Sequence, residues 1–220
     1  MKTLEFWFSI GSPYTYLTIM RLPPVVTKTG LTVLWRPFSV RQIMQEMAYH
    51  PYEDKPVRTA YMWTDIGRQA RKLGLTPRLP APLPILGYEL ANRVAVVAVE
   101  EGWVSDYVSE TYRCWFHDGH PAGQEPNLSH TLTKLGQDPD RVIALAEGPA
   151  TGQAFEATTR AARARGVFDT PSFVVEDEVY CGDDRLADAL RHAIPKARAK
   201  PLQRVTDQPA PLRHQAGKRA

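Results

Sequence analysis

The spacing of hydrophobic positions divides the chain into two strand-rich parts separated by a long helical stretch. An apolar run over residues 3–9 predicts a buried strand, and a second run over 31–38 predicts another. Between them the chain breaks at Gly11, and apolar residues then recur at near-helical spacing to about Lys28, which predicts one helix. Strand, helix and strand in this order form a β-α-β unit of a size that suits a parallel pair.

From about Ser39 to Arg165 the apolar spacing becomes helical, interrupted by glycines and by a rigid proline-rich connection at 78–84. Helices are predicted over residues 57–73, 86–103, 107–116, 128–136, 139–147 and 149–165.

The last part of the chain returns to strand character. Residues 172–175 and 178–181 predict a tight hairpin, and an amphipathic helix is predicted to follow it. We expect Asp183 or Asp184 to cap this helix. The complete order, β-α-β, helical insert and β-β-α, predicts an α/β fold with a large all-helical insertion.

Composition indicates a soluble globular protein of 220 residues, with 43% hydrophobic and 23% charged residues. No apolar run is long enough to span a bilayer, and the N-terminus does not resemble a signal peptide, so we expect a cytoplasmic protein. The formal charge of +3 comes from the tail, because residues 196–220 hold seven Lys or Arg and one Asp. The remainder has no basic stripe and no nucleic-acid motif, so we expect no nucleic-acid partner.

The turn Ser12-Pro13-Tyr14-Thr15 after the first strand allows two interpretations of Ser12. One is structural: Ser at the N-cap with Pro at the first helical position is a favoured way to start a helix. The other is functional, because a helix N-terminus carries a partial positive charge that stabilises a thiolate. Local sequence alone favours the structural interpretation. Cys114 and Cys181 lie far apart in the sequence, and we expect both to be free thiols.

Several stretches together carry a family resemblance: "FWFSIGSPYTYL", "LTVLWRPF", "RTAYMWTDIGRQARKLGL" and "GVFDTPSFVVEDEVYCGDDRLADAL". They cover about residues 3–195 and resemble a thioredoxin-like domain with a DsbA-like helical insertion. The Ser-Pro-Tyr turn, which stands where redox members carry Cys-x-x-Cys, is similar to that of 2-hydroxychromene-2-carboxylate isomerases and kappa-class glutathione transferases. The resemblance implies a thioredoxin-like domain of residues 1–38 and 166–195 and a helical insertion domain of 39–165. The composition of residues 196–220 predicts a basic, flexible tail.

The same resemblance implies that glutathione binds at this turn as a cofactor. It implies that the Ser12 hydroxyl donates to the glutathione thiolate, with capping of the helix as its role when the site is empty. It also implies that Pro171 is cis, and that the backbone of Thr170 is unpaired and binds the cysteinyl backbone of glutathione. Because that contact uses the backbone, we expect the side chain at 170 to be free to vary.

Three residues at the end of the hairpin, Gly182, Asp183 and Asp184, stand where the family binds the γ-glutamyl end of glutathione. Asp184 suits the glutamyl ammonium, whereas Asp183 adds a second carboxylate that can repel the glutamyl carboxylate. Arg58 is expected to meet a carboxylate of glutathione or of the substrate, or else to be a solvated helix charge.

The activity that the resemblance implies is a glutathione-dependent cis-trans isomerisation of a small aromatic-derived substrate, by a homodimer. The alternatives are a kappa-like transferase or peroxidase that consumes glutathione, and a non-catalytic thiol-binding paralogue. The pair His117 and His120 lacks a third ligand, so we expect no metal site. One or two aromatic side chains are expected to line the substrate pocket and the others to lie in the core: Trp35, Phe38, Tyr61, Trp63, Trp115 and Phe116.

Overall fold

A computed structural model describes residues 2–49, 51–52 and 54–194, and the predicted tail of 196–220 lies outside this range. The strands of the described residues are β1 (Leu4–Phe8), β2 (Val33–Pro37), β3 (Ser172–Val175) and β4 (Glu178–Cys181). They form one mixed sheet in the order β2-β1-β3-β4. As predicted, β1 and β2 are parallel and β3 and β4 form a hairpin, while β3 lies antiparallel to β1.

The segment between β1 and β2 forms two helices, α1 (Pro13–Ile19) and α2 (Leu22–Thr29), so the prediction of one continuous helix is wrong. The cause is the pair Pro23 and Pro24, which lack N–H groups and are tolerated only in a first helical turn. A new helix therefore begins at Leu22, and Arg21 lies at its start.

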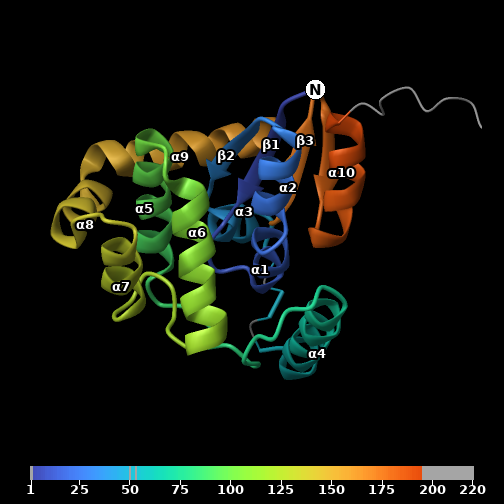
Figure 1. Ribbon diagram of the computed structural model, residues 1–220, viewed down its shortest axis with the longest axis horizontal. Coiled ribbons are helices and arrows are strands. Elements are labelled where there is room, and N and C mark those ends of the chain that lie inside the picture. The colour runs from blue at the N-terminus through green and yellow to red at the C-terminus, as the bar shows by residue number, and fades with distance from the viewer. Residues whose placement is uncertain (1, 50, 53, 195–220) are drawn as a thin grey trace, which may run out of the picture.

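The helical stretch contains the predicted helices and one that was not predicted, α3. Its elements are α3 (Val40–Glu46), α4 (Pro56–Lys72), α5 (Tyr88–Glu101), α6 (Val104–Arg113), a π-helix (Cys114–Asp118), α7 (Asn127–Lys134), α8 (Pro139–Glu147) and α9 (Pro149–Ala164). Helices α5 to α8 gather on the β2 side of the sheet, whereas α10 (Leu186–Ala193) packs on β3 and β4 at the other edge (Figure 1). Each helix of the described residues is too short or too polar to cross a bilayer.

The larger of two hydrophobic clusters among the described residues joins the sheet to helices that cover it. Phe6 at its centre stacks on Phe8 and Phe173, with ring centroids 5.3 Å and 5.4 Å away, and meets Trp35 edge-on at 5.2 Å. The same core includes Trp115 and much of α5 and α6, so burial fixes the helical stretch against the strands. Of the aromatic residues expected in the core, Tyr61 is an exception, because its side chain is exposed.

Candidate active site

Ser12 lies in the turn that leads from β1 into α1, at the N-cap position of the helix. Its hydroxyl donates to the main-chain oxygen of Thr170, 3.0 Å away, and makes no capping bond. The expectation that Ser12 caps α1 is therefore wrong for this structure. Two of the first helical positions need no side-chain cap, because Pro13 has no N–H and the N–H of Thr15 bonds to the main-chain oxygen of Ser12 at 3.2 Å.

Thr170 is fixed by each of its polar groups beside the cis bond to Pro171, which was predicted correctly. Its hydroxyl accepts from the N–H of Ser9 at 3.0 Å and lies 3.3 Å from the hydroxyl of Thr15. The expectation that its side chain is free to vary is therefore wrong. Its N–H donates to the carboxylate of Asp169 at 2.7 Å, so the expectation of an unpaired backbone is also wrong. The neighbouring carboxylate reaches this N–H from one residue away.

Two buried tyrosines from the helical stretch contact the segment between β1 and α1 through hydrogen bonds and packing. The hydroxyl of Tyr112 donates to the main-chain oxygen of Ser12 at 3.0 Å. The hydroxyl of Tyr88 lies 2.6 Å from that of Ser9, and its ring packs on Gly11. A Cβ at Gly11 would lie 2.8 Å from this ring, and the φ of +131° there is one that other residues rarely adopt, so glycine is required.

Asn92 is a further supporting residue that the sequence analysis missed. Its side-chain amide bonds both main-chain groups of Ile10, accepting at 2.7 Å and donating at 2.9 Å. The signal was present, because Asn92 is a polar residue inside the apolar run of α5, and a buried amide requires partners. The helical stretch therefore holds the turn that carries Ser12.

Asp183 points away from the site and toward α1. Its carboxylate accepts from the hydroxyl of Thr18 at 2.8 Å and forms an ion pair with Arg21, and its side chain is only 11% exposed. Burial raises the pKa of Asp183, with a smaller rise from the charge of Asp184, whereas Arg21 and Thr18 lower it, and the net shift is upward. Since Arg21 offsets its charge, Asp183 repels an anionic ligand less than its position in the sequence suggests.

Asp184 is exposed, at 72%, and lies 3.3 Å from the guanidinium of Arg185. The expectation that Asp183 or Asp184 caps α10 is wrong. Residues 183–185 form a separate 3-10 turn, and Arg185 stands at the N-cap of α10 without a side-chain bond. The N–H of Gly182 donates to the oxygen of Pro171 at 2.8 Å, which ties this segment to the cis-proline turn.

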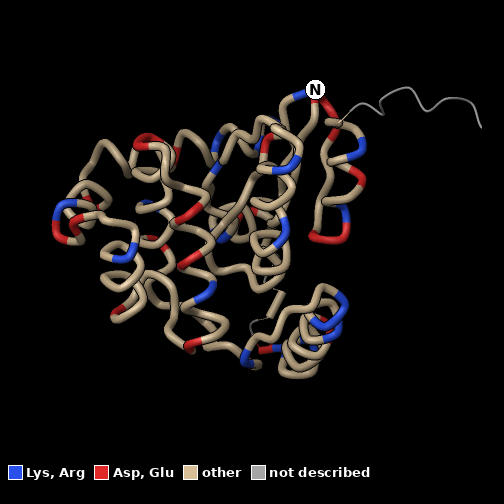
Figure 2. Tube along the Cα trace, in the orientation of Figure 1, with Lys and Arg blue, Asp and Glu red and all other residues tan. Residues whose placement is uncertain are grey.

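Arg58 lies near the first turn of α4, a helix that carries four basic residues and one acidic residue. Figure 2 shows basic and acidic positions interspersed along the chain, with several basic positions on α4. The exposed guanidinium of Arg58 donates to the hydroxyl of Tyr49 at 2.9 Å. It also faces Asp169: burial raises the pKa of Asp169, and the charge of Arg58 partly opposes that rise. Arg58 therefore belongs to the surroundings of the cis-proline turn.

A cleft of about 730 Å³ lies between the start of α4 and the proline-rich connection. Its lining includes Tyr52, Asp54, Lys55, Trp63 and Pro80. Burial raises the pKa of Tyr52 to about 12, and the charge of Asp169, which precedes the cis-proline turn by one residue, adds to this rise. Aromatic faces of this kind suit a planar molecule.

Of the two histidines considered as metal ligands, His117 has a side-chain partner, because its Nε2 lies 3.0 Å from the hydroxyl of Tyr16.

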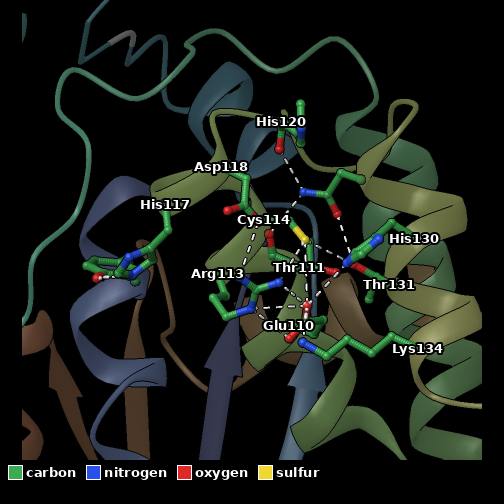
Figure 3. A network of polar contacts seen from close by, with 12 residues as sticks. Glu110, Thr111, Arg113, Cys114, His117, Asp118, His120, His130, Thr131 and Lys134 are labelled. Carbon is green, nitrogen blue, oxygen red and sulfur yellow. Dashed lines mark hydrogen bonds and ion pairs between the residues drawn. The ribbon is translucent and has the colours of Figure 1, made fainter.

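A different group, Glu110, Cys114 and His130, has its potential ligand atoms within 4.8 Å of one another (Figure 3). However, Arg113 and Lys134 already bond to the Glu110 carboxylate at 2.5 Å and 2.8 Å. Burial raises the pKa of Glu110, but these two cations more than offset it and hold the value at about 2. Burial also raises the pKa of Cys114, which keeps its thiol protonated. The geometry favours a partly buried ion-pair network over a cation site.

The comparisons with known proteins agree with this architecture. The family model of the DSBA-like thioredoxin domain matches residues 3–194, so the chain belongs to that family. A 2-hydroxychromene-2-carboxylate isomerase of Sphingobium xenophagum is 26% identical over 188 residues, which are 84% of this chain and 94% of that protein. Glutathione S-transferase kappa 1 of Caenorhabditis elegans is 31% identical over 84 residues, 38% of this chain and 37% of that protein.

A solved structure of a 2-hydroxychromene-2-carboxylate isomerase superposes with a TM-score of 0.77 at 23% identity, over 84% of this chain and 91% of that one. The DsbA-like thioredoxin fold with its helical insertion, predicted from the sequence, is thus confirmed.

Proposed function

We propose that the protein is a glutathione-dependent isomerase of the 2-hydroxychromene-2-carboxylate type. The observation that carries the proposal is the Ser12 hydroxyl, placed at a helix N-terminus beside cis-Pro171. The chain is also similar over most of its length to a protein named 2-hydroxychromene-2-carboxylate isomerase. Glutathione would supply a thiolate that adds to an unsaturated carbon of the substrate and leaves after bond rotation, so that it is not consumed.

The residues of the turn fit a thiolate. The N-terminus of α1 favours negative charge, and rotation about one side-chain bond lets Ser12 exchange its acceptor, the Thr170 oxygen, for a sulfur. Asp184 is exposed and can meet an ammonium group, while Asp183 is held aside by Arg21. One group opposes the fit, because the N–H of Thr170 is already bonded to Asp169.

The cleft lined by Tyr52 and Trp63 is the proposed place for the aromatic-derived substrate. The excess of basic residues on α4, Arg58 among them, attracts an anionic substrate and an anionic cofactor to this side of the molecule. A cytoplasmic location and a homodimer remain part of the proposal.

The second candidate is a kappa-like transferase or peroxidase, which the partial similarity to a kappa-class enzyme favours. It would use the same thiolate but consume glutathione, so the glutathione concentration after many turnovers separates the two activities. The third alternative, a non-catalytic paralogue with a weakened thiol site, would catalyse neither reaction, and absence of glutathione binding would favour it.

The proposal is tested by replacing Ser12 with Ala. The variant should bind glutathione in a calorimetric titration but lose about a hundredfold or more in kcat, because one donor to the reacting charge is missing. Ser109→Ala is a matched control, since that hydroxyl also donates to a main-chain oxygen, that of Ser105 at 2.7 Å, but on α6. Equal activity of Ser12→Ala and Ser109→Ala would refute the role of Ser12.

A further inference from the structure

The carboxylate of Asp169 accepts a hydrogen bond from a main-chain N–H at the centre of the candidate site. It accepts from the N–H of Thr170 at 2.7 Å, while the Ser12 hydroxyl bonds the main-chain oxygen of Thr170 at 3.0 Å. The main-chain oxygen of Asp169 accepts from the hydroxyl of Ser172 at 2.7 Å, so the residue is fixed on both sides. The two groups with which Thr170 could pair an extended ligand are thus bonded to Asp169 and to Ser12.

The charge of Asp169 acts on the same place. The side chain is half-buried, and its charge interacts with Arg58 on α4, Tyr52 before α4 and Cys181 on β4. Burial raises the pKa of the Cys181 thiol, and the charge of Asp169 adds to this rise. A carboxylate that disfavours one nearby thiolate also disfavours another placed at Ser12, although Arg58 offsets part of its charge.

We infer that Asp169 is a specificity-determining residue that weakens the binding of glutathione at this site. The inference rests on the proposed function, in which glutathione is the thiol that binds here. Two effects act together: the carboxylate competes for the Thr170 N–H, and its negative charge opposes the thiolate. A ligand that offers a cationic or neutral group to Asp169 avoids the second effect, so the residue selects among thiols by charge.

Two substitutions separate these effects. Asp169→Asn keeps a side-chain oxygen for the Thr170 N–H but removes the charge, whereas Asp169→Ala removes both. The exposed Asp177, in the turn between β3 and β4, provides a matched control, Asp177→Asn, for the loss of one negative charge.

The experiment measures calorimetric titrations of the full chain and its variants with glutathione and with S-methylglutathione, which has no ionisable thiol. Asp169→Ala should lower the Kd for both ligands by about threefold or more, the value of one modest hydrogen bond. Asp169→Asn should lower the Kd for glutathione, leave that for S-methylglutathione unchanged, and lower the thiol pKa of bound glutathione, measured by ultraviolet absorbance. Asp177→Asn should change none of these.

Glutathione binding that is unchanged or weaker in both Asp169 variants would overturn the inference and leave the proposed function standing. If Asp169→Ala does not fold, Asp169→Asn decides alone. A lower Kd for glutathione and a lower thiol pKa of bound glutathione would support the inference, and no change in either would overturn it. Failure of wild type and of every folded variant to bind glutathione would refute the proposed function itself, and the inference with it. Binding by the Asp169 variants alone would support the inference and exclude glutathione as the cofactor of the wild-type chain.

Discussion

Replacing Arg21 with Met tests whether the turn after β4 is held to the junction of α1 and α2 by the Arg21–Asp183 ion pair. The Arg21 guanidinium bonds both the carboxylate and, at 3.1 Å, the main-chain oxygen of Asp183. The Asp183 side chain is 11% exposed and that of Arg21 28%. Met keeps the aliphatic stem of Arg21 and removes only its polar group, so the carboxylate loses its cation while the packing is largely kept.

The expected loss of stability lies between those for a surface and a fully buried pair. Removing one partner of a fully buried pair costs about 3–5 kcal/mol, whereas an exposed pair contributes up to about 1 kcal/mol. Because water reaches Arg21, we expect about 2 kcal/mol at neutral pH, which corresponds to a drop of about 4–8 °C in Tm for a protein of this size.

The loss of stability caused by Arg21→Met should become smaller as the pH falls. Burial raises the pKa of Asp183 above its unfolded value, and without Arg21 it would rise further. A carboxyl group with a raised folded pKa destabilises the native state when it is ionised, and this penalty disappears as the pH falls through the folded pKa. The difference between wild type and Arg21→Met should therefore be largest near neutral pH and shrink toward about pH 4.

The assay is urea unfolding followed by circular dichroism at several pH values. Arg185→Met is the control, because Arg185 pairs with Asp184 and Asp188 at the surface, where we expect a change of less than about 0.5 kcal/mol. An equal loss in both variants, or a deficit in Arg21→Met that does not change with pH, would show that the ion pair does not stabilise this turn.

Two further predictions concern the site. Asp184→Asn should raise the KM for glutathione by about three- to tenfold and leave kcat unchanged, because an exposed charge contributes only modest ground-state binding; an unchanged KM would remove Asp184 from the cofactor site. The Cys114→Ser, Cys181→Ser double variant should keep its isomerase activity, and neither it nor the wild type should reduce insulin, because burial raises the pKa of both free thiols. Insulin reduction by wild type that the double variant lacks would reveal a redox centre.

The strands and the order of elements could be predicted because their signals are local. Alternating and continuous apolar runs mark the strands, and Thr170-Pro171 before a strand is a recognisable turn. The break between α1 and α2 was also visible, in Pro23 and Pro24, but the apolar spacing that continues past them favoured one helix.

The partners within the site could not be predicted, because they lie far apart in the sequence. Arg21 and Asp183 are 162 positions apart, and Asn92 is 82 positions from the Ile10 peptide that it bonds. Asp169 illustrates another limit. It is adjacent to Thr170, yet sequence does not reveal whether a carboxylate turns toward its neighbour's N–H or toward solvent.

The most direct test of the proposed activity is the isomerisation of 2-hydroxychromene-2-carboxylate to its ring-opened trans form, with glutathione present at far lower concentration than substrate. We predict no enzyme-catalysed reaction without glutathione, many turnovers per glutathione molecule when it is present, and an unchanged thiol concentration at the end. Consumption of one glutathione per product would instead identify a transferase or peroxidase, and isomerisation that proceeds equally well without glutathione would contradict the thiolate role proposed for the turn at Ser12.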